Sequence, residues 1–429
     1  MPSLTTLKAL VEEEMVQLEE EGCDVHVTAS DIEMSGNSTD SLMKIYNQLR
    51  SLKPRADFPF REPSDLAGIR KERPEGPRQM NARTAAKKLT GRLHGAWLGR
   101  VAGCMLGKPV EGRPHDWITA YLANAGCWPL ADYFPKTSND AAGKAIELNP
   151  EWCRGGIQAG ASDDDTNYTI IALTLMETNG YTFTTADVGE QWLRLLPYHS
   201  VCTAERQAYA NMVAELPLAD VPLHLNPYRE WIGAQIRGDF FGYVTPGHPE
   251  LGAELAWRDA SLSHIKNGIY GEMLVAAMLS AALVLDDVEQ VVRVGLTEVP
   301  RKSRLAEAAN DVLAWHKENA DWQQTLKAVM CKYGHYHPVH TINNACIVLL
   351  SLLYGNKDFT KTIGIAVMCG LDTDCNGATA GSVCGAMLGA EKIPSNWTWP
   401  LCDTLCSTVS GFGENKILDL AARTKRLWR

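Results

Sequence analysis

The chain opens with a helical pattern of apolar positions. In LTTLKALVEEEMVQLEEE (residues 4–21), leucine, valine and methionine recur every three or four residues among glutamates. This spacing places the apolar side chains on one face of an α-helix, so we predict a strongly acidic amphipathic helix over residues 4–21. A second, shorter helix is predicted over residues 41–52.

Residues 53–80 lack such a period. The segment KPRADFPFREPSDLAGIRKERPEGPRQM is rich in proline and charged residues, which is typical of a linker or of a strap laid over a surface. We therefore expect residues 1–88 to form a helical extension with a linker, and residues 89–429 to form the main domain.

From about Thr90 onward, helical patterns dominate and alternating, strand-like patterns are scarce. We therefore predict an all-α domain. The longest apolar run, MLVAAMLSAALVL (residues 273–285), is shorter than the ~20 residues that a membrane-spanning helix needs, so we predict a buried helix and no membrane association. The predicted helices of this domain cover residues 89–107, 166–180, 184–196, 204–216, 249–263, 268–285, 287–299, 303–319, 321–333, 340–355, 358–370 and 377–390.

Composition narrows the function classes. Hydrophobic residues make up 45% of the 429-residue chain, which allows a large core. The net charge of −10 argues against a surface for a nucleic-acid duplex, although a bound metal ion would still allow a small anionic substrate. The 12 cysteines form no CxxC pair and the N-terminus lacks a signal-peptide pattern, so we expect mostly buried free thiols in a cytoplasmic protein.

An acidic run, SDDDTNYT, stands just before a helical pattern that begins near Asn167. One aspartate would be enough to cap this helix. The three carboxylates of Asp163, Asp164 and Asp165 repel one another, and a cation would relieve this repulsion. The run alone leaves both interpretations open, an over-charged cap and a metal site.

A second acidic stretch, GLDTDCNGATAG, follows the same logic. Asp372 and Asp374 precede a helical segment of small residues. Oxygen ligands two residues apart suit a hard cation such as Mg²⁺, Mn²⁺ or Ca²⁺. An EF-hand loop is excluded because Val383 stands where that loop needs its twelfth-position glutamate.

A third stretch, HGAWLGRVAGCMLGKPVEG, carries a glycine at every fourth position: Gly95, Gly99, Gly103 and Gly107. These glycines lay a bare stripe along one helix face, which lets another helix or a ligand approach closely. Glu111 follows where the helix is expected to end.

Together, the three stretches resemble the ADP-ribosylglycohydrolases, which include dinitrogenase reductase-activating glycohydrolase and the ADP-ribosyl-acceptor hydrolases. GCMLGKPVEG resembles the family's G-D-x-x-G followed by glutamate, DDDT resembles [ST]-D-D-T, and GLDTDC resembles G-G-D-[ST]-D-[ST]. Their order and rough spacing match over about residues 90–395. The resemblance implies an all-α orthogonal helical bundle around two divalent cations, Mg²⁺ or Mn²⁺.

The resemblance also implies roles for single residues. Asp164 and Asp165 match metal ligands of the second motif, and Asp372 and Asp374 match those of the third. Asp163 stands in place of the family's serine or threonine and is a further candidate ligand.

Catalysis is expected from Glu111 or Asp164, either of which can orient or deprotonate the attacking water. His264 resembles a histidine that contacts the substrate's phosphates, and a structural histidine packed beside Trp257 is the alternative. The expected substrate-binding residues are Gly103, Gly107, Glu111, His264 and Asn376.

The sequence departs from the family pattern at two further positions. Cys104 replaces the aspartate of G-D-x-x-G, and Cys375 stands where a hydroxyl is expected; its sulfur suits Mg²⁺ poorly. Residues 226–247, which include Arg229 and Arg237, differ from the glycine-rich loop expected beside ADP-ribose. They form either a different substrate wall or ordinary packing.

These expectations favour a metal-dependent glycosidase that removes ADP-ribose from a modified protein or a small acceptor. One alternative is a hydrolase of a nucleoside or another ribosylated small metabolite. Another is a non-catalytic structural relative, although such a protein has no physical reason to keep four clustered aspartates. The oligomeric state is left open.

Overall fold

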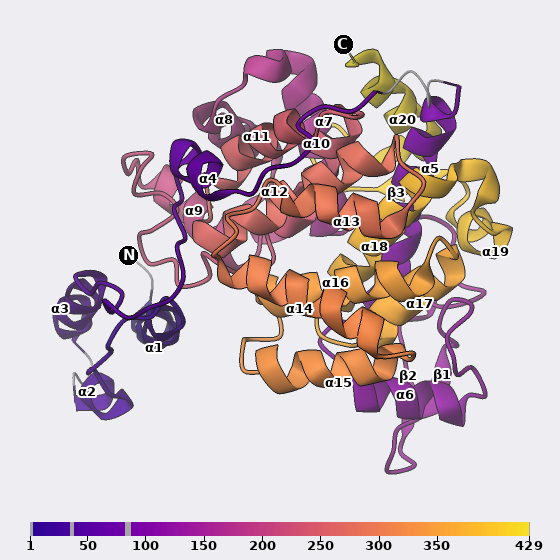
Figure 1. Cartoon of the computed structure of the whole chain (residues 1–429). Helices are drawn as coiled ribbons and strands as arrows, with labels where there is room; N and C mark the ends of the chain where they lie inside the picture. The colour runs from indigo at the N-terminus through magenta and orange to yellow at the C-terminus, as the bar shows by residue number, and fades with distance from the viewer. Residues whose placement is uncertain (1–2, 35–37, 82–86, 429) are drawn as a thin grey trace.

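The computed structural model describes residues 3–34, 38–81 and 87–428. This part of the chain is built from helices, together with two small antiparallel sheets of two strands each (Figure 1). The expected all-α class is therefore confirmed.

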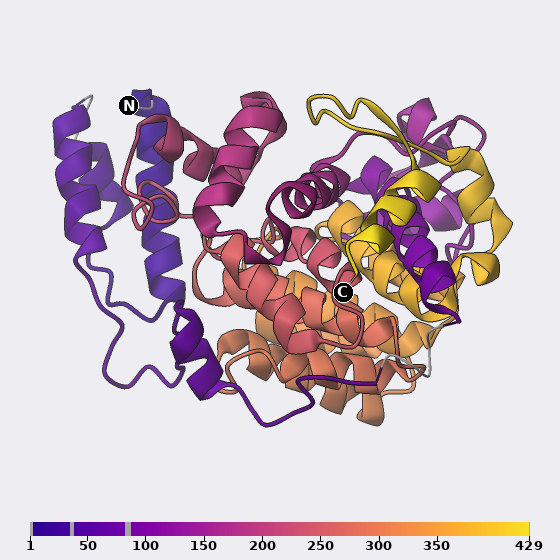
Figure 2. The ribbon, with the colours of Figure 1, turned by 90° about the horizontal axis from the view of Figure 1, so that it is seen from above.

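The N-terminal helices lie at one side of the molecule in both views (Figures 1 and 2). They are α1 (Leu4–Glu20), α2 (Ala29–Met34) and α3 (Thr39–Arg50). Both helices expected here are present, and they share a small apolar core of their own that also takes in Leu225 of the body.

The proline-rich strap contains a short helix that the sequence pattern did not predict, α4 (Leu66–Glu72). It begins because the Asp65 side chain accepts a hydrogen bond from the Gly68 amide at 2.8 Å. With only seven residues, it is too short to produce a clear apolar period.

Buried ion pairs hold the extension to the body. The guanidinium of Arg229 lies 2.6 Å from Glu14 and 2.8 Å from Glu21, both contributed by the N-terminal segment. Arg304 pairs in the same way with Glu62 of the strap at 2.8 Å. The extension is therefore tied to the body by charge, and the division near residue 88 remains a prediction.

The body follows from residue 89. No element was predicted for its two hairpins or for the helices at residues 115–124, 239–243, 395–398 and 417–426. Three-residue strands leave no readable alternation, and the helices of five and four residues are too short to show a period. Its helices are α5 (Leu89–Gly107), α6 (His115–Asn124), α7 (Asp164–Asn179), α8 (Thr185–Leu195), α9 (Thr203–Val213), α10 (Asp239–Tyr243), α11 (Pro249–Ala260), α12 (Lys266–Ala282), α13 (Val288–Leu296), α14 (Arg304–Glu318), α15 (Trp322–Tyr333), α16 (Thr341–Gly355), α17 (Phe359–Met368), α18 (Thr373–Leu388), α19 (Ser395–Thr398) and α20 (Ile417–Arg426). Its strands are β1 (Thr137–Asn139), β2 (Ala145–Glu147), β3 (Thr404–Cys406) and β4 (Glu414–Lys416).

Helices α5 and α18 pack backbone against backbone. A Cβ atom on Gly99 would lie 2.1 Å from the Gly381 carbonyl oxygen, and one on Gly95 would lie 2.4 Å from that of Gly385. The residue numbers of the contacting glycines decrease along α18 as they increase along α5, so the two helices run antiparallel. The glycine stripe predicted on residues 95–107 therefore meets a second helix.

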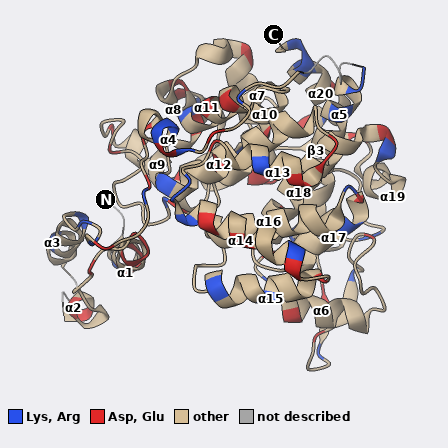
Figure 3. Cartoon of the chain, in the orientation of Figure 1, with Lys and Arg blue, Asp and Glu red and all other residues tan. Residues whose placement is uncertain are grey.

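The centre of the body is apolar. Helix α16 carries no charged residue and is drawn entirely in the neutral colour in Figure 3. Across the described ranges, no helix combines the length and the apolar character needed to cross a bilayer.

The helices of both acidic stretches begin earlier than the sequence pattern indicated. Helix α7 begins at Asp164, where we expected a start near Asn167, and α18 begins at Thr373, where we expected Gly377. The apolar period starts only after these polar first turns, so the pattern placed both starts too late. The aspartates therefore lie in helix first turns, where backbone N–H groups favour negative charge.

Candidate functional site

The antiparallel pairing of α5 and α18 brings the first and third motifs together. The hydroxyl of Thr373 donates to the Gly107 carbonyl at 2.8 Å, so the start of α18 lies against the end of α5. The chain after α5 then runs beside the turn before α18, and the Gly112 amide donates to the Leu371 carbonyl at 3.2 Å. Glu111 therefore lies beside the aspartates of the third motif.

Three groups of side chains could each hold a metal ion. Within each group, the potential ligand atoms lie within 4.8 Å of one another. Each group contains at least two carboxylates. Asp165 and Asp374 each belong to two groups. We name them the inner group (Cys104, Asp163 and Asp165), the middle group (Asp165, Asp374 and Cys375) and the outer group (Glu111, Asp372 and Asp374).

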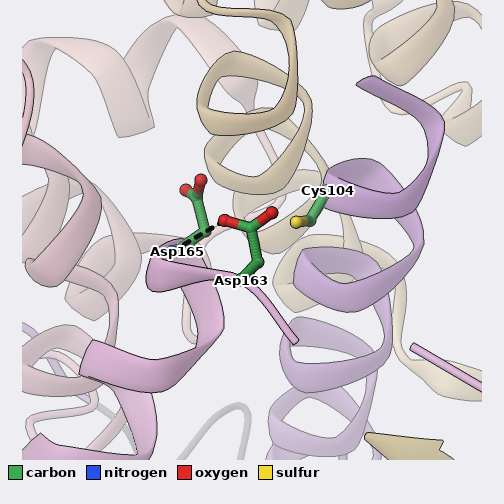
Figure 4. A group of neighbouring side chains, drawn as sticks. All are labelled: Cys104, Asp163 and Asp165. Atoms are coloured by element: carbon green, nitrogen blue, oxygen red, sulfur yellow. Dashed lines mark hydrogen bonds between the residues drawn. The ribbon is translucent and has the colours of Figure 1, made fainter. Parts of the chain in front are cut away.

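Figure 4 shows the inner group. Cys104 projects from α5 toward Asp163 and Asp165 at the start of α7. The Asp165 amide donates to Oδ1 of Asp163 at 3.2 Å, so Asp163 caps α7. Asp372 occupies the same position at α18, but its side chain makes no capping hydrogen bond. Capping thus accounts for one of these aspartates and leaves the others available for another role.

Asp164 stands outside the three groups. It is the first residue of α7 and is half-buried beside its two neighbours. Burial, together with the charges of Asp163 and Asp165, raises its pKa well above the ordinary value for an aspartate. Its carboxyl therefore holds a proton more firmly than a free aspartate does.

Lys108 brings a positive charge into the inner group. Its Nζ lies 2.5 Å from Oδ2 of Asp163 and 4.9 Å from the centre of the Trp152 ring. Burial disfavours the charged forms of both partners, yet their attraction outweighs it: the pKa of Asp163 is lowered and that of Lys108 is raised. No local pattern indicated this pair, because Asp163 and Lys108 are 55 residues apart.

Arg100 supports the inner group from behind. Its Nε donates to the main-chain carbonyl of Asp165 at 3.0 Å, and its Nη2 lies 3.4 Å from Oδ1 of the same residue. Nη1 lies 2.8 Å from Oδ2 of Asp239, so Arg100 forms ion pairs with two buried carboxylates.

Among the described residues, two buried carboxylate oxygens of the cluster lack a partner. Oδ2 of Asp165 and Oδ1 of Asp374 are buried and have no hydrogen-bond partner within the described part of the chain. Burial raises the pKa of both carboxyls well above the ordinary value, and Asp163 and Asp372, respectively, add repulsion. Burial likewise raises the pKa of Asp372 to about 7. A cation at this place would replace protons as the partner of these oxygens.

The two cysteines of the cluster are buried thiols. Burial and the nearby carboxylates raise the pKa of Cys104 and of Cys375 well above the ordinary value. Thiols that stay protonated are poor metal ligands, so the donors that suit a hard cation here are carboxylate oxygens. All 12 cysteines are free, and seven of them are buried.

The expected substrate-binding residues fall in three environments. Gly103 and Gly107 lie against the α18 backbone: a Cβ atom on them would be 1.9 Å and 2.1 Å from the carbonyl oxygens of Gly377 and Thr373. Asn376 is buried, and its amide donates to Asn344 at 2.8 Å. Glu111 is exposed at the edge of the cluster.

Asn344 of α16 was not singled out from the sequence, although it orders this turn. Its Oδ1 accepts from the Asp372 amide at 3.2 Å as well as from Asn376. Its own amide donates to the main-chain carbonyls of Pro338 and His340, both at 2.8 Å. A polar side chain inside the otherwise apolar segment of α16 was the available signal.

His264 lies apart from the three groups, fully buried and hydrogen-bonded to the Ser263 hydroxyl at 2.8 Å. Burial, and then the charge of Arg237, lower its pKa well below the ordinary value, so the imidazole is neutral. Arg237 itself lies 2.5 Å from both Glu205 and Asp259. Arg229 and Arg237 therefore form internal ion pairs, and a contact of His264 with phosphate remains a prediction.

Comparisons with known proteins identify the family and the fold. A family model described as ADP-ribosylglycohydrolase matches residues 85–428. A solved structure described as an ADP-ribosylglycohydrolase-related protein complex is similar with a TM-score of 0.50 and 20% identity, over 80% of this chain and 99% of that one. Among curated proteins, no sequence matches. The structural similarity supports the fold alone, whereas the family model spans most of the sequence; the chain belongs to the ADP-ribosylglycohydrolase family.

Proposed function

We propose that the chain is a metal-dependent hydrolase of a ribosyl glycosidic bond, and that its substrate is ADP-ribose attached to a protein or a small acceptor. One observation carries this proposal: carboxylates from the segment after α5 and from the starts of α7 and α18 converge, and buried oxygens of Asp165 and Asp374 lack a partner among the described residues. A cluster of this kind is costly in a merely structural protein, since each buried acceptor needs a donor or a cation.

The donor set fits a hard divalent cation. The residues that would hold it are Asp163, Asp165, Asp372, Asp374 and Glu111, all of which offer carboxylate oxygens. The resemblance to the family implies two ions, Mg²⁺ or Mn²⁺. When bound, divalent ions would orient sugar hydroxyls and stabilise negative charge on oxygen.

The remaining chemistry falls to side chains of this chain. Cleavage breaks the C1′ bond through an oxocarbenium-like state, and water adds to C1′ while the leaving group gains a proton. Glu111, at the exposed edge, is placed to orient the water and accept its proton. Asp164, whose pKa is raised by burial and by its neighbours, is suited to hold a proton for the leaving group.

The test is a substrate panel with controlled metal content. ADP-ribosyl-arginine, ADP-ribosyl-serine and free nucleosides would be incubated with the full-length protein and Mg²⁺, Mn²⁺ or EDTA, and released ADP-ribose or ribose measured. We expect release that EDTA abolishes and added metal restores. Release that EDTA leaves unchanged would overturn the metal dependence, and no release from any substrate would favour a non-catalytic relative.

A second candidate, a hydrolase of a nucleoside or another small ribosylated metabolite, is favoured by a cavity next to Lys108. This cavity of about 280 Å³, just below the usual range of about 300–1,000 Å³ for small-molecule sites, is lined in part by Gln158, Cys406 and Trp152, whose ring lies against Lys108. In the same panel, cleavage of free nucleosides without cleavage of ADP-ribosylated substrates would select this candidate.

A cytoplasmic location remains a prediction that cell fractionation would test.

A further inference from the structure

The inner and outer groups differ in the charge that already faces them. In the inner group, the ammonium of Lys108 is in contact with Asp163 at 2.5 Å. In the outer group, no lysine or arginine of the described ranges forms an ion pair with Asp372, Asp374 or Glu111. Lys108 is therefore in ion-pair contact with the inner group, whereas its charge acts on Glu111 and Asp374 of the outer group only from beyond ion-pair distance.

Each end of the cluster has one buried oxygen without a hydrogen-bond partner among the described residues, Oδ2 of Asp165 and Oδ1 of Asp374, but only the Asp165 carboxylate has an arginine as ion-pair partner, Arg100. Oδ1 of Asp374 has no hydrogen-bond partner among the described residues, and the residue is only 4% exposed. Asp374 belongs to the outer group and projects into it from the first turn of α18. A buried acceptor without a donor marks a place that an ion or an ordered water fills. This acceptor supports an ion at the outer group independently of the number of acidic residues there.

Lys108 is fixed where it is by both its backbone and its side chain. It begins the short 3₁₀ helix Lys108–Val110, directly after α5, so its main chain is anchored to the body. Its ammonium lies between the Asp163 carboxylate and the Trp152 ring, 4.9 Å from the ring centre. A divalent ion bound to Asp163 would have to displace this ammonium or lie next to it, and like charges repel.

We propose that the Lys108 ammonium takes the place of one divalent cation, so that this chain binds a single divalent ion, at the outer group of Glu111, Asp372 and Asp374. This inference rests on the metal dependence proposed above and narrows the expected number of ions from two to one. The ammonium has three N–H donors and uses one on Asp163, which leaves donors for a hydroxyl or phosphate oxygen of the substrate.

The test counts bound ions without reference to activity. Full-length protein freed of metal would be titrated with Mn²⁺, and free Mn²⁺ followed by its electron paramagnetic resonance signal. We expect one Mn²⁺ per chain for the wild type and two for Lys108→Met, because the neutral side chain releases Asp163. Lys108→Arg keeps the charge and should bind one. Lys136→Met, which removes an exposed ion-pair partner of Glu147, is the matched control and should also bind one.

The outcomes separate this inference from the proposal on which it depends. Two ions in the wild type, with the spin coupling of a manganese pair, would overturn the role of Lys108 and leave metal dependence intact. One ion in Lys108→Met would also overturn it, provided that circular dichroism shows a folded variant. If that variant does not fold, the counts for the wild type and Lys108→Arg still decide. No bound Mn²⁺ in the wild type would overturn both proposals.

Discussion

A Cβ atom on Gly103 would lie only 1.9 Å from the carbonyl oxygen of Gly377, so the two helices that carry these glycines touch through their main chains. This contact sets the spacing between the end of α5 and the start of α18. Any widening there also moves Glu111 away from Asp372 and Asp374.

Gly103→Ala is therefore expected to destabilise the protein. The added methyl group has no flexible neighbour to displace, since it would meet backbone atoms. We expect the free energy of unfolding to fall by about 1–3 kcal/mol, the typical cost of overpacking a core. Gly91→Ala is the control in the same helix, because nothing lies within 4 Å of its Cβ position. It should be neutral or gain about 0.5–1 kcal/mol from helix propensity. Equal effects of the two changes in urea unfolding would contradict the close contact.

Asp374→Asn should make the metal-free protein more stable than the wild type and should reduce the stability that the protein gains from added metal. In metal-free protein, burial raises the pKa of the Asp374 carboxyl, so folding must either take up a proton or bury a charge, whereas a neutral amide needs neither, and the melting temperature should rise. The rise in melting temperature on adding Mn²⁺ should shrink, and kcat/KM should fall by at least about tenfold, the lower bound for changes around a metal site. Differential scanning and the substrate panel measure both effects. Asp116→Asn, an exposed change on α6, should leave both unaltered. Raised stability with unchanged activity for Asp374→Asn would select the structural relative.

Arg100→Met should be among the most damaging single changes in the body. It removes the buried partner of both Asp165 and Asp239, and loss of one member of a buried ion pair costs about 3–5 kcal/mol. Adding Asp239→Asn should recover part of this loss, because one of the two stranded carboxyls is then neutral. Strictly additive losses in the double variant would show that Arg100 and Asp239 do not interact.

The free energy of unfolding should fall as pH rises, because Glu20 of α1 loses its proton. Burial, and then the charge of Glu230, raise the pKa of Glu20 to about 8, so the folded state holds this proton more tightly than the unfolded state. This contribution to stability is complete below the unfolded pKa of about 4.5 and is lost as pH rises toward 8, with a size on the order of 4 kcal/mol. Glu20→Gln should therefore lose less stability than the wild type between pH 6 and pH 8.5 in thermal unfolding. Glu19→Gln, an exposed change on the same helix, should follow the wild type.

Prediction from sequence worked where the signal was local. The helical period placed α1, α5 and α12 within a few residues, and consecutive charges marked Asp163–Asp165 and the Asp372–Asp374 pair as unusual. The glycine stripe predicted a close neighbour on α5, although it could not tell a helix from a ligand.

Prediction failed where the partner is distant in sequence. Lys108 reads as an ordinary basic residue until the fold places it against Asp163, and Asn344 reads as a polar interruption of an apolar helix until its side chain is seen beneath Asp372. Arg229 and Arg237 could equally have faced a substrate, and only the packing shows that they form internal ion pairs. Such pairings depend on how helices register in space, which no local period encodes.

The glycine contact between α5 and α18 also has a consequence for the order in which the protein can fold during synthesis. The hydrogen bond from Thr373 to Gly107 joins positions 266 residues apart, so it cannot form until most of the chain has left the ribosome. Until then, Glu111 is not in contact with Asp372 and Asp374, and water hydrates its carboxylate. The repulsion between Glu111 and these two aspartates arises only when the two helices close on each other, so helix closure must supply the free energy that crowds them. A nascent chain stalled before residue 373 would have only the repulsion within Asp163–Asp165.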